Sequence, residues 1–157
     1  MSGKTGAVLA ALTMLGMTLA TPAYAGCWEG RSVDAAKIRD MQTMLMVGSL
    51  RCRMVGTDVL PSYNRFVNNN RGALKQINAQ LRDHFGGDTG YDRFTTSLAN
   101  SYGSGSKGIK DCDALRDIAN KAAAAKGNSQ HLLAIADDAG VNPVEKSRQC
   151  RVKVAAR

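Results

Sequence analysis

Four cysteines carry the clearest chemistry in this sequence, because paired thiols in an oxidising compartment form disulfides. They are Cys27, Cys52, Cys112 and Cys150, and all of them follow the N-terminal stretch 1–25. An even number of cysteines in a short exported chain predicts two disulfides. Four cysteines allow three pairings, so the choice between them depends on the helices predicted below.

A second group with possible chemistry surrounds His84, with Asp92 and Ser97 further along the chain. A hydroxyl nucleophile, an imidazole base and a carboxylate that orients the base form the catalytic set of many hydrolases. The nucleophile of such enzymes lies on a strained turn, whereas Ser97 falls inside a predicted helix. We therefore predict no catalytic residue. A small hydrolase acting around His84 and residues 91–97 is the alternative.

Metal ligands do not converge in this sequence. A zinc site needs about four ligands, but His84 and His131 are far apart and the cysteines are expected in disulfides. Met41, Met44 and Met46 are similar to the methionine clusters that hold copper(I). Met46, however, points about 200° around a helix from Met44. We predict that these methionines pack in the core and that the protein holds no metal.

The segment Gly103–Gly108 fits the pattern G-x-G-x-x-G. In dinucleotide-binding proteins this pattern joins a β-strand to the N-terminus of a helix. Here a predicted helix precedes it and no parallel sheet follows. We therefore interpret the segment as a flexible connector and predict no cofactor.

Residues 1–25 have the pattern of a secretory signal: a cation at Lys4, an apolar run over 7–20 and a small-x-small site ending at Ala25. The run is shorter than the about 20 residues that span a membrane. We predict a periplasmic or secreted protein that is cleaved after Ala25, with no transmembrane span. The alternative is a lipoprotein anchored at Cys27, because residues 24–27 resemble a lipobox.

Apolar residues recur every three or four positions along most of the remaining chain, which is the helical period. The spacing predicts helices over residues 33–55, 58–85, 88–102, 111–126 and 129–139. Strand patterns are nearly absent, apart from the brief alternation at residues 151–154. We therefore predict an all-α fold, an antiparallel helical bundle of four to five helices with two disulfides. Residues 26–157 form a single domain with a basic tail from about residue 146.

The long first helix restricts the disulfide pairing. Its ends would lie about 30 Å apart, and the few residues before it reach at most about 20 Å, so Cys27 cannot meet Cys52. In an up-down bundle the end of the first helix lies beside the start of the fourth. This arrangement favours Cys52 with Cys112, and Cys27 with Cys150. The pairing of Cys27 with Cys112 and Cys52 with Cys150 remains open.

Charge is segregated along the chain, which has a net charge of +8. Residues 31–82 carry nine cations and three anions, residues 83–145 carry six and nine, and residues 146–157 carry five and none. Basic surfaces attract anionic partners, so we expect an anionic envelope component or another exported protein. Nucleic acid is not an expected partner, because the chain is exported and only 5% of its residues are aromatic.

Several segments are similar to a family of small exported bacterial helical proteins of unestablished function. They are Cys27-Trp28, Ala35–Met46, Leu50–Arg53, Tyr63–Val67 and Tyr91–Asn100. Some members of this family carry the label S-adenosyl-L-homocysteine hydrolase, an enzyme built on an NAD-binding Rossmann domain. The helical pattern here does not support that label, and the resemblance implies no catalytic residue. The sequence thus favours a non-enzymatic binding or envelope-associated module.

Overall fold

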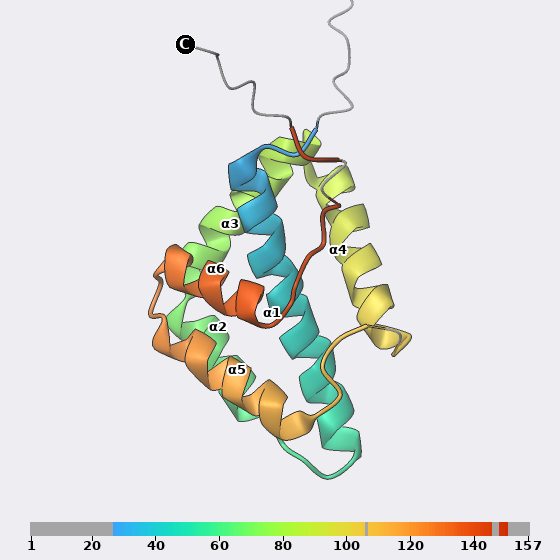
Figure 1. Ribbon diagram of the computed structural model, residues 1–157, viewed down its shortest axis with the longest axis vertical. Coiled ribbons are helices and arrows are strands. Elements are labelled where there is room, and N and C mark those ends of the chain that lie inside the picture. The colour runs from blue at the N-terminus through green and yellow to red at the C-terminus, as the bar shows by residue number, and fades with distance from the viewer. Residues whose placement is uncertain (1–26, 106, 146–147, 151–157) are drawn as a thin grey trace, which may run out of the picture.

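The computed structural model describes residues 27–105, 107–145 and 148–150 of the chain. Within these residues the fold is all-α, as predicted, and contains six helices (Figure 1). Their bounds are α1 Gly30–Met54, α2 Leu60–Asn69, α3 Arg71–Phe85, α4 Asp88–Gly103, α5 Cys112–Ala124 and α6 Ser129–Asp138. The predicted signal segment, the cleavage site at Ala25, the strand-like residues 151–154 and most of the basic tail lie outside the described residues.

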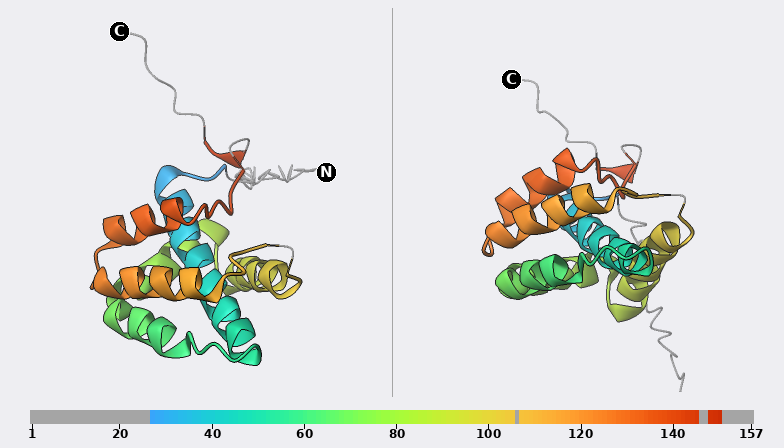
Figure 2. Two further views of the ribbon diagram at one scale, coloured as in Figure 1. Left: turned by 60° about the horizontal axis from the view of Figure 1, so that its bottom comes forward. Right: turned by 90° about the horizontal axis from the view of Figure 1, so that it is seen from below.

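Helix α1 is the centre of the fold. It packs against each of the other five helices, with α2 and α3 on one side, α4 on the other, and α5 and α6 across the front (Figures 1 and 2). This position explains why buried residues occur on several sides of α1 rather than along one stripe. Of the methionines on α1, Met41 and Met44 are buried in the core, whereas Met46 is exposed. The predicted core packing is therefore confirmed for Met41 and Met44 and is wrong for Met46.

Helices α1 and α5 pack closely against each other at Gly48. A Cβ atom at Gly48 would lie only 2.5 Å from Leu115 Cδ2, and both residues are buried. The absence of a side chain at Gly48 therefore allows the two helices to pack closely. Helix α5 begins at a side-chain cap, since the Asp111 carboxylate accepts hydrogen bonds from the backbone N–H groups of Asp113 and Ala114.

The start of α1 differs from the prediction. The sequence predicts a helix from residue 33, whereas α1 begins at Gly30 with Glu29 as its N-cap. No side chain caps this end. Trp28, the residue before the N-cap, pairs with Gln149 of the C-terminal segment. The backbone of Glu29 is still extended, and the helix begins at the next residue.

The predicted helix over residues 58–85 is two helices, α2 and α3, which meet at Asn70. The apolar residues keep the same helical spacing on both sides of this break, so the periodicity does not reveal it. Asn70 is fully buried. Its Nδ2 donates to the carbonyls of Phe66 (2.8 Å) and Ala122 (2.9 Å), and its Oδ1 accepts from the N–H of Gly127 (2.7 Å). The side chain thus fixes the α2–α3 junction to the end of α5 and the loop that follows it.

Two disulfides connect distant parts of the chain, and both are the pairs that the sequence favoured. Cys52 at the end of α1 bonds Cys112 at the start of α5, and Cys27 bonds Cys150. Around the second bond, the Trp28 N–H donates to the Arg148 carbonyl (2.8 Å) and the Cys150 N–H donates to the Trp28 carbonyl (2.9 Å). We call residues 27–28 and 148–150 the terminal clasp. It holds the two ends of the described chain together.

An ion pair between a partly exposed lysine and a buried aspartate holds the connector between α4 and α5. Asp40 on α1 is fully buried, and its Oδ2 accepts from the Lys107 ammonium at 2.9 Å. Burial and the adjacent Asp40 carboxylate raise the pKa of Tyr102 far above its ordinary value. Lys107 also lies 5.0 Å from the centre of the Tyr102 ring. The glycine pattern at 103–108 therefore belongs to a connector, as predicted, but this connector is attached to the core through Lys107.

Candidate functional site

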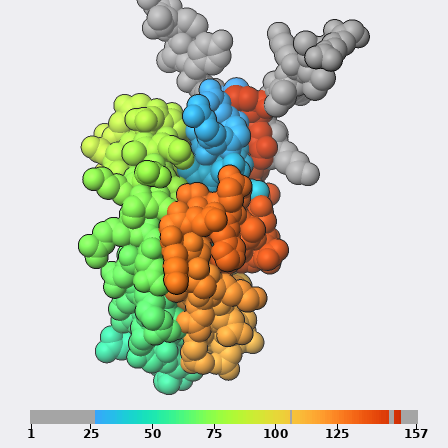
Figure 3. Space-filling model, turned by 90° about the vertical axis from the view of Figure 1, so that its left-hand side faces the viewer, coloured from blue at the N-terminus to red at the C-terminus, as the bar shows by residue number. Residues whose placement is uncertain are grey.

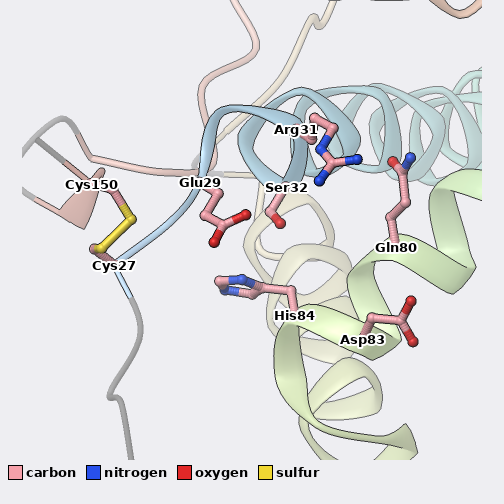
Figure 4. Close-up of a pocket in the computed structure, with 8 residues that line it drawn as sticks. All are labelled: Cys27, Glu29, Arg31, Ser32, Gln80, Asp83, His84 and Cys150. Carbon is pink, nitrogen blue, oxygen red and sulfur yellow. A yellow bond between two sulfur atoms is a disulfide. The ribbon is translucent and has the colours of Figure 1, made fainter. Parts of the chain in front are cut away.

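A cleft with a volume of about 530 Å³ lies beside the terminal clasp. We call it the terminal cleft. Its walls come from the clasp disulfide, the first residues of α1 and the end of α3 (Figure 4). The residues that line it are Cys27, Glu29, Arg31, Ser32, Gln80, Asp83, His84 and Cys150. A smaller cleft of about 220 Å³ shares Arg31 and Gln80 with it and continues toward the N-terminus of α6.

His84 lies in this cleft because α3 ends beside the clasp. Its ring stacks on Trp28, with centroids 4.0 Å apart and planes inclined by 30°. Phe85 and Phe94 pack against the other sides of Trp28, at centroid distances of 5.4 and 5.7 Å. This aromatic cluster accounts for the half-buried state of His84 and fixes the plane of its ring.

The polar neighbours of His84 are not those that the hydrolase interpretation uses. Asp92 and Ser97 are exposed on α4 and do not line the cleft. The carboxylate and the hydroxyl that do line it belong to Glu29 and Ser32, and both point into the same space as the His84 ring (Figure 4). Among the described residues, no hydrogen bond joins the His84 ring to either of them. The cleft therefore holds an imidazole, a carboxylate and a hydroxyl without a connected catalytic set.

Sequence reasoning missed Glu29 and Ser32. The only signal for them is their position within five residues of Cys27 and next to Trp28, whose ring stacks on His84 at the end of α3. The sequence does not show that the start of α1 meets the end of α3. The side chains therefore become neighbours of His84 only when the packing is known.

Burial lowers the pKa of His84, and the negative charge of Glu29 opposes this shift. The folded protein thus takes up a proton at lower pH than the unfolded chain does. At pH values above the unfolded pKa of 6.5 the imidazole is neutral in both states, and the stability is fully present. As the pH falls below that value, the unfolded chain binds the proton first and stability is lost.

We expect His84→Gln to reduce the loss of stability between about pH 7.5 and about pH 5.5. The measurement is the urea midpoint of both proteins at the two pH values. His131→Gln, at an exposed position on α6, is the matched control. An equal change in the control would contradict the assignment to His84.

A cation stripe runs along one side of α3. Arg71, Lys75 and Arg82 are all exposed, and their spacing of four and seven residues places them on one helix face. Arg82 pairs with Asp88 (2.5 Å) and lies over the Tyr91 ring at 4.4 Å. The opposite edge of α3 carries Gln76 and Gln80, which line the clefts. We call the three cations the α3 cation stripe.

The chain segment 59–82, which carries the three cations of the stripe, contains no Asp or Glu. It includes four cations, and amide side chains occupy many exposed positions there, among them Asn64, Asn68, Asn69 and Gln76. Arg71 donates to Asn68 (3.3 Å) rather than to a carboxylate. In the part of the chain that the structure describes, no ion pair involves Arg71 or Lys75. Two of the three cations of the stripe thus lack a carboxylate partner among the described residues.

Metal binding finds no support in the geometry. Within the described residues, no group of three or more His, Cys, Asp or Glu side chains is placed to hold a metal ion. Likewise, none of the described helices is both long and apolar enough to cross a membrane.

Comparisons of the chain with models of known protein families, with curated proteins and with solved structures give no match.

Proposed function

We propose that this protein is a non-enzymatic binding module of an extracytoplasmic compartment, and that the α3 cation stripe binds an anionic component of the cell envelope. The observation that carries the proposal is the acid-free segment 59–82 with its exposed Arg71 and Lys75. Cations without carboxylate partners gain most from an anionic partner, because no existing ion pair has to be broken. The rigid helix also keeps the charges at a fixed spacing.

Export of the chain belongs to the same proposal. It is supported by the signal-like residues 1–25 and by the two disulfides, which are typical of oxidising compartments. The Cys27–Cys150 bond favours simple cleavage after Ala25 over lipidation, since a lipidated Cys27 has no thiol left for a disulfide. The intact mass of the exported protein distinguishes the two forms.

We expect Arg71→Gln with Lys75→Gln to weaken binding of a soluble polyanion, such as dextran sulfate, by about thirtyfold at low salt, because each cation contributes about 1 kcal/mol near an anionic surface. Fluorescence anisotropy of the labelled polymer measures the affinity. The matched control is Lys121→Gln with Lys126→Gln, which removes the same charge from exposed positions in and just after α5. Equal losses in the two variants would show that net charge alone attracts the polymer, against the proposal.

A second candidate function is a small hydrolase at the terminal cleft. The observation that favours it is the presence of Glu29 and Ser32 beside His84 in one cleft. Turnover of simple ester or amide substrates that disappears in both Ser32→Ala and His84→Ala would support it. Turnover that survives in either variant would exclude these residues as a catalytic set.

A further inference from the structure

We propose that an apolar ridge at the C-terminal end of α1 inserts into the surface of an anionic lipid bilayer. The ridge consists of Met46, Leu50, Met54 and Val55. This inference deepens the proposed function and rests on it, since it names a lipid bilayer as the anionic partner.

The ridge is the place where exposed apolar side chains gather. Met46 is 37% exposed, Leu50 53%, Met54 87% and Val55 72%, and these are the large hydrophobic residues that the described chain leaves exposed. Single exposed apolar residues scattered over a surface are ordinary, whereas a contiguous group marks an interaction site. Met46, Leu50 and Met54 are four residues apart, so they line up along one side of α1.

The direction of the ridge follows from the packing of α1. Gly48 faces Leu115 of α5, and Leu50 lies about 200° further around the helix. The ridge therefore points away from α5. Nearer the N-terminus, the same side of α1 is covered: Thr43 is buried, and Arg39 lies over the Tyr91 ring of α4. Seen from below, α1 runs between α2 and α4 and is covered by α5 on one side only (Figure 2).

The shape of the ridge fits a bilayer better than a small ligand or a second copy of the chain. It ends at the last turn of α1, at the opposite end of the molecule from the terminal clasp (Figure 1). None of its residues lines either of the two clefts. A stable interface between copies buries about 800 Å² and 20–30 residues on each side, whereas the ridge has four side chains. A convex apolar tip needs no complementary groove to insert among lipids.

The chain segment that carries the ridge is rich in cations, and the Cys52–Cys112 bond also brings the exposed Asp111 and Asp113 to this end of α1. Between Asp40 and Asp83 the sequence contains one carboxylate, Asp58, and six cations. Arg53 is exposed and adjoins Met54. Its long side chain allows the guanidinium to reach lipid phosphates while the apolar neighbours enter the acyl region. The α3 cation stripe lies further from the ridge, since the side view shows α2 between the end of α1 at the bottom of the molecule and α3 above it (Figure 3).

The test is cosedimentation of the oxidised protein with vesicles of phosphatidylglycerol and phosphatidylcholine, and with vesicles of phosphatidylcholine alone. We expect binding to the anionic vesicles and a loss of about tenfold in Leu50→Ser with Met54→Ser, because two of the inserted side chains become polar. The control places serine at two other exposed helical positions, Ala124→Ser with Ala134→Ser, and should bind like the unchanged protein. Circular dichroism confirms that each variant is folded.

Insertion has its own readout. The chain has a single tryptophan, Trp28, which lies in the terminal clasp. A Met54→Trp variant should therefore show a blue-shifted emission with vesicles, and brominated lipids should quench it more than they quench the unchanged protein. An unshifted emission together with equal binding of the two serine variants would overturn the inference.

The outcomes separate this inference from the proposed function. Binding of dextran sulfate without binding of vesicles would overturn the inference and leave the proposed function intact. Binding of neither would overturn both. Self-association that disappears in Leu50→Ser with Met54→Ser, without vesicle binding, would assign the ridge to a second copy instead.

Discussion

Replacing both Cys52 and Cys112 with alanine is expected to lower the free energy of unfolding by about 4 kcal/mol. The bond closes a loop across 60 residues, and its loss gives the unfolded chain the freedom that the crosslink removes. Cys52 is also fully buried against the core, so the shorter side chain leaves a small cavity. Many domains of this size have only 5–15 kcal/mol in total. Urea unfolding followed by circular dichroism measures the difference.

The same substitutions at Cys27 and Cys150 provide the comparison. Their separation of 123 residues predicts a slightly larger loss, about 5 kcal/mol. A decrease of less than about 1 kcal/mol in the free energy of unfolding of the Cys52/Cys112 variant would contradict the expected contribution of a crosslink of this length. The unchanged protein in excess reductant should match a variant that lacks all four cysteines.

The second large effect is expected at Asn70. Asn70→Ala removes three hydrogen bonds from a fully buried position. It leaves the carbonyl of Ala122 and the N–H of Gly127 without this partner, and each buried unsatisfied group costs about 1–3 kcal/mol. We expect the free energy of unfolding to fall by about 3 kcal/mol, measured by thermal or urea unfolding.

Two further variants show whether the effect belongs to the buried amide. Asn68→Ala, two residues earlier and exposed, should change stability by less than about 0.5 kcal/mol. Asn70→Asp keeps an acceptor for Gly127 but loses the donor and buries a charge, so it should be at least as damaging as alanine. A stable Asn70→Ala protein would show that the α2–α3 junction does not depend on this side chain.

The sequence predicts the parts of the fold that depend on local pattern. Helical periodicity places α4, α5 and α6 within two residues of their observed ends, and Asp111 caps α5 because an Asp before an apolar run can accept the free N–H groups of the first turn. The length of α1 excludes a bond between Cys27 and Cys52, and the expected up-down topology favours the pairing that is observed.

The features that the sequence does not predict depend on contacts between distant residues. The break at Asn70 arises from acceptors and donors more than 50 positions away, while the apolar pattern around it continues unchanged. The pairing of Asp40 with Lys107 joins residues 67 positions apart. The ridge is missed for the same reason, because Met46 and Leu50 fit a core pattern and only the packing shows that no helix covers them.

The candidate site was predicted only in part. His84 was identified by its chemistry, but Asp92 and Ser97 were proposed as its neighbours because they are near in sequence. In the structure Asp92 and Ser97 are exposed on α4 and lie outside the terminal cleft. Glu29 and Ser32 line this cleft with His84 instead.

The terminal clasp also changes how the chain can be cut. The bond between Cys27 and Cys150 closes the described chain into a covalent ring, and the bond between Cys52 and Cys112 lies across that ring. A single peptide bond broken anywhere between residues 27 and 150 therefore releases no fragment. A protease that nicks an exposed loop leaves one molecule, with every helix still attached to its neighbours. In a compartment with proteases and no means of resynthesis, such a topology prolongs the life of the folded protein.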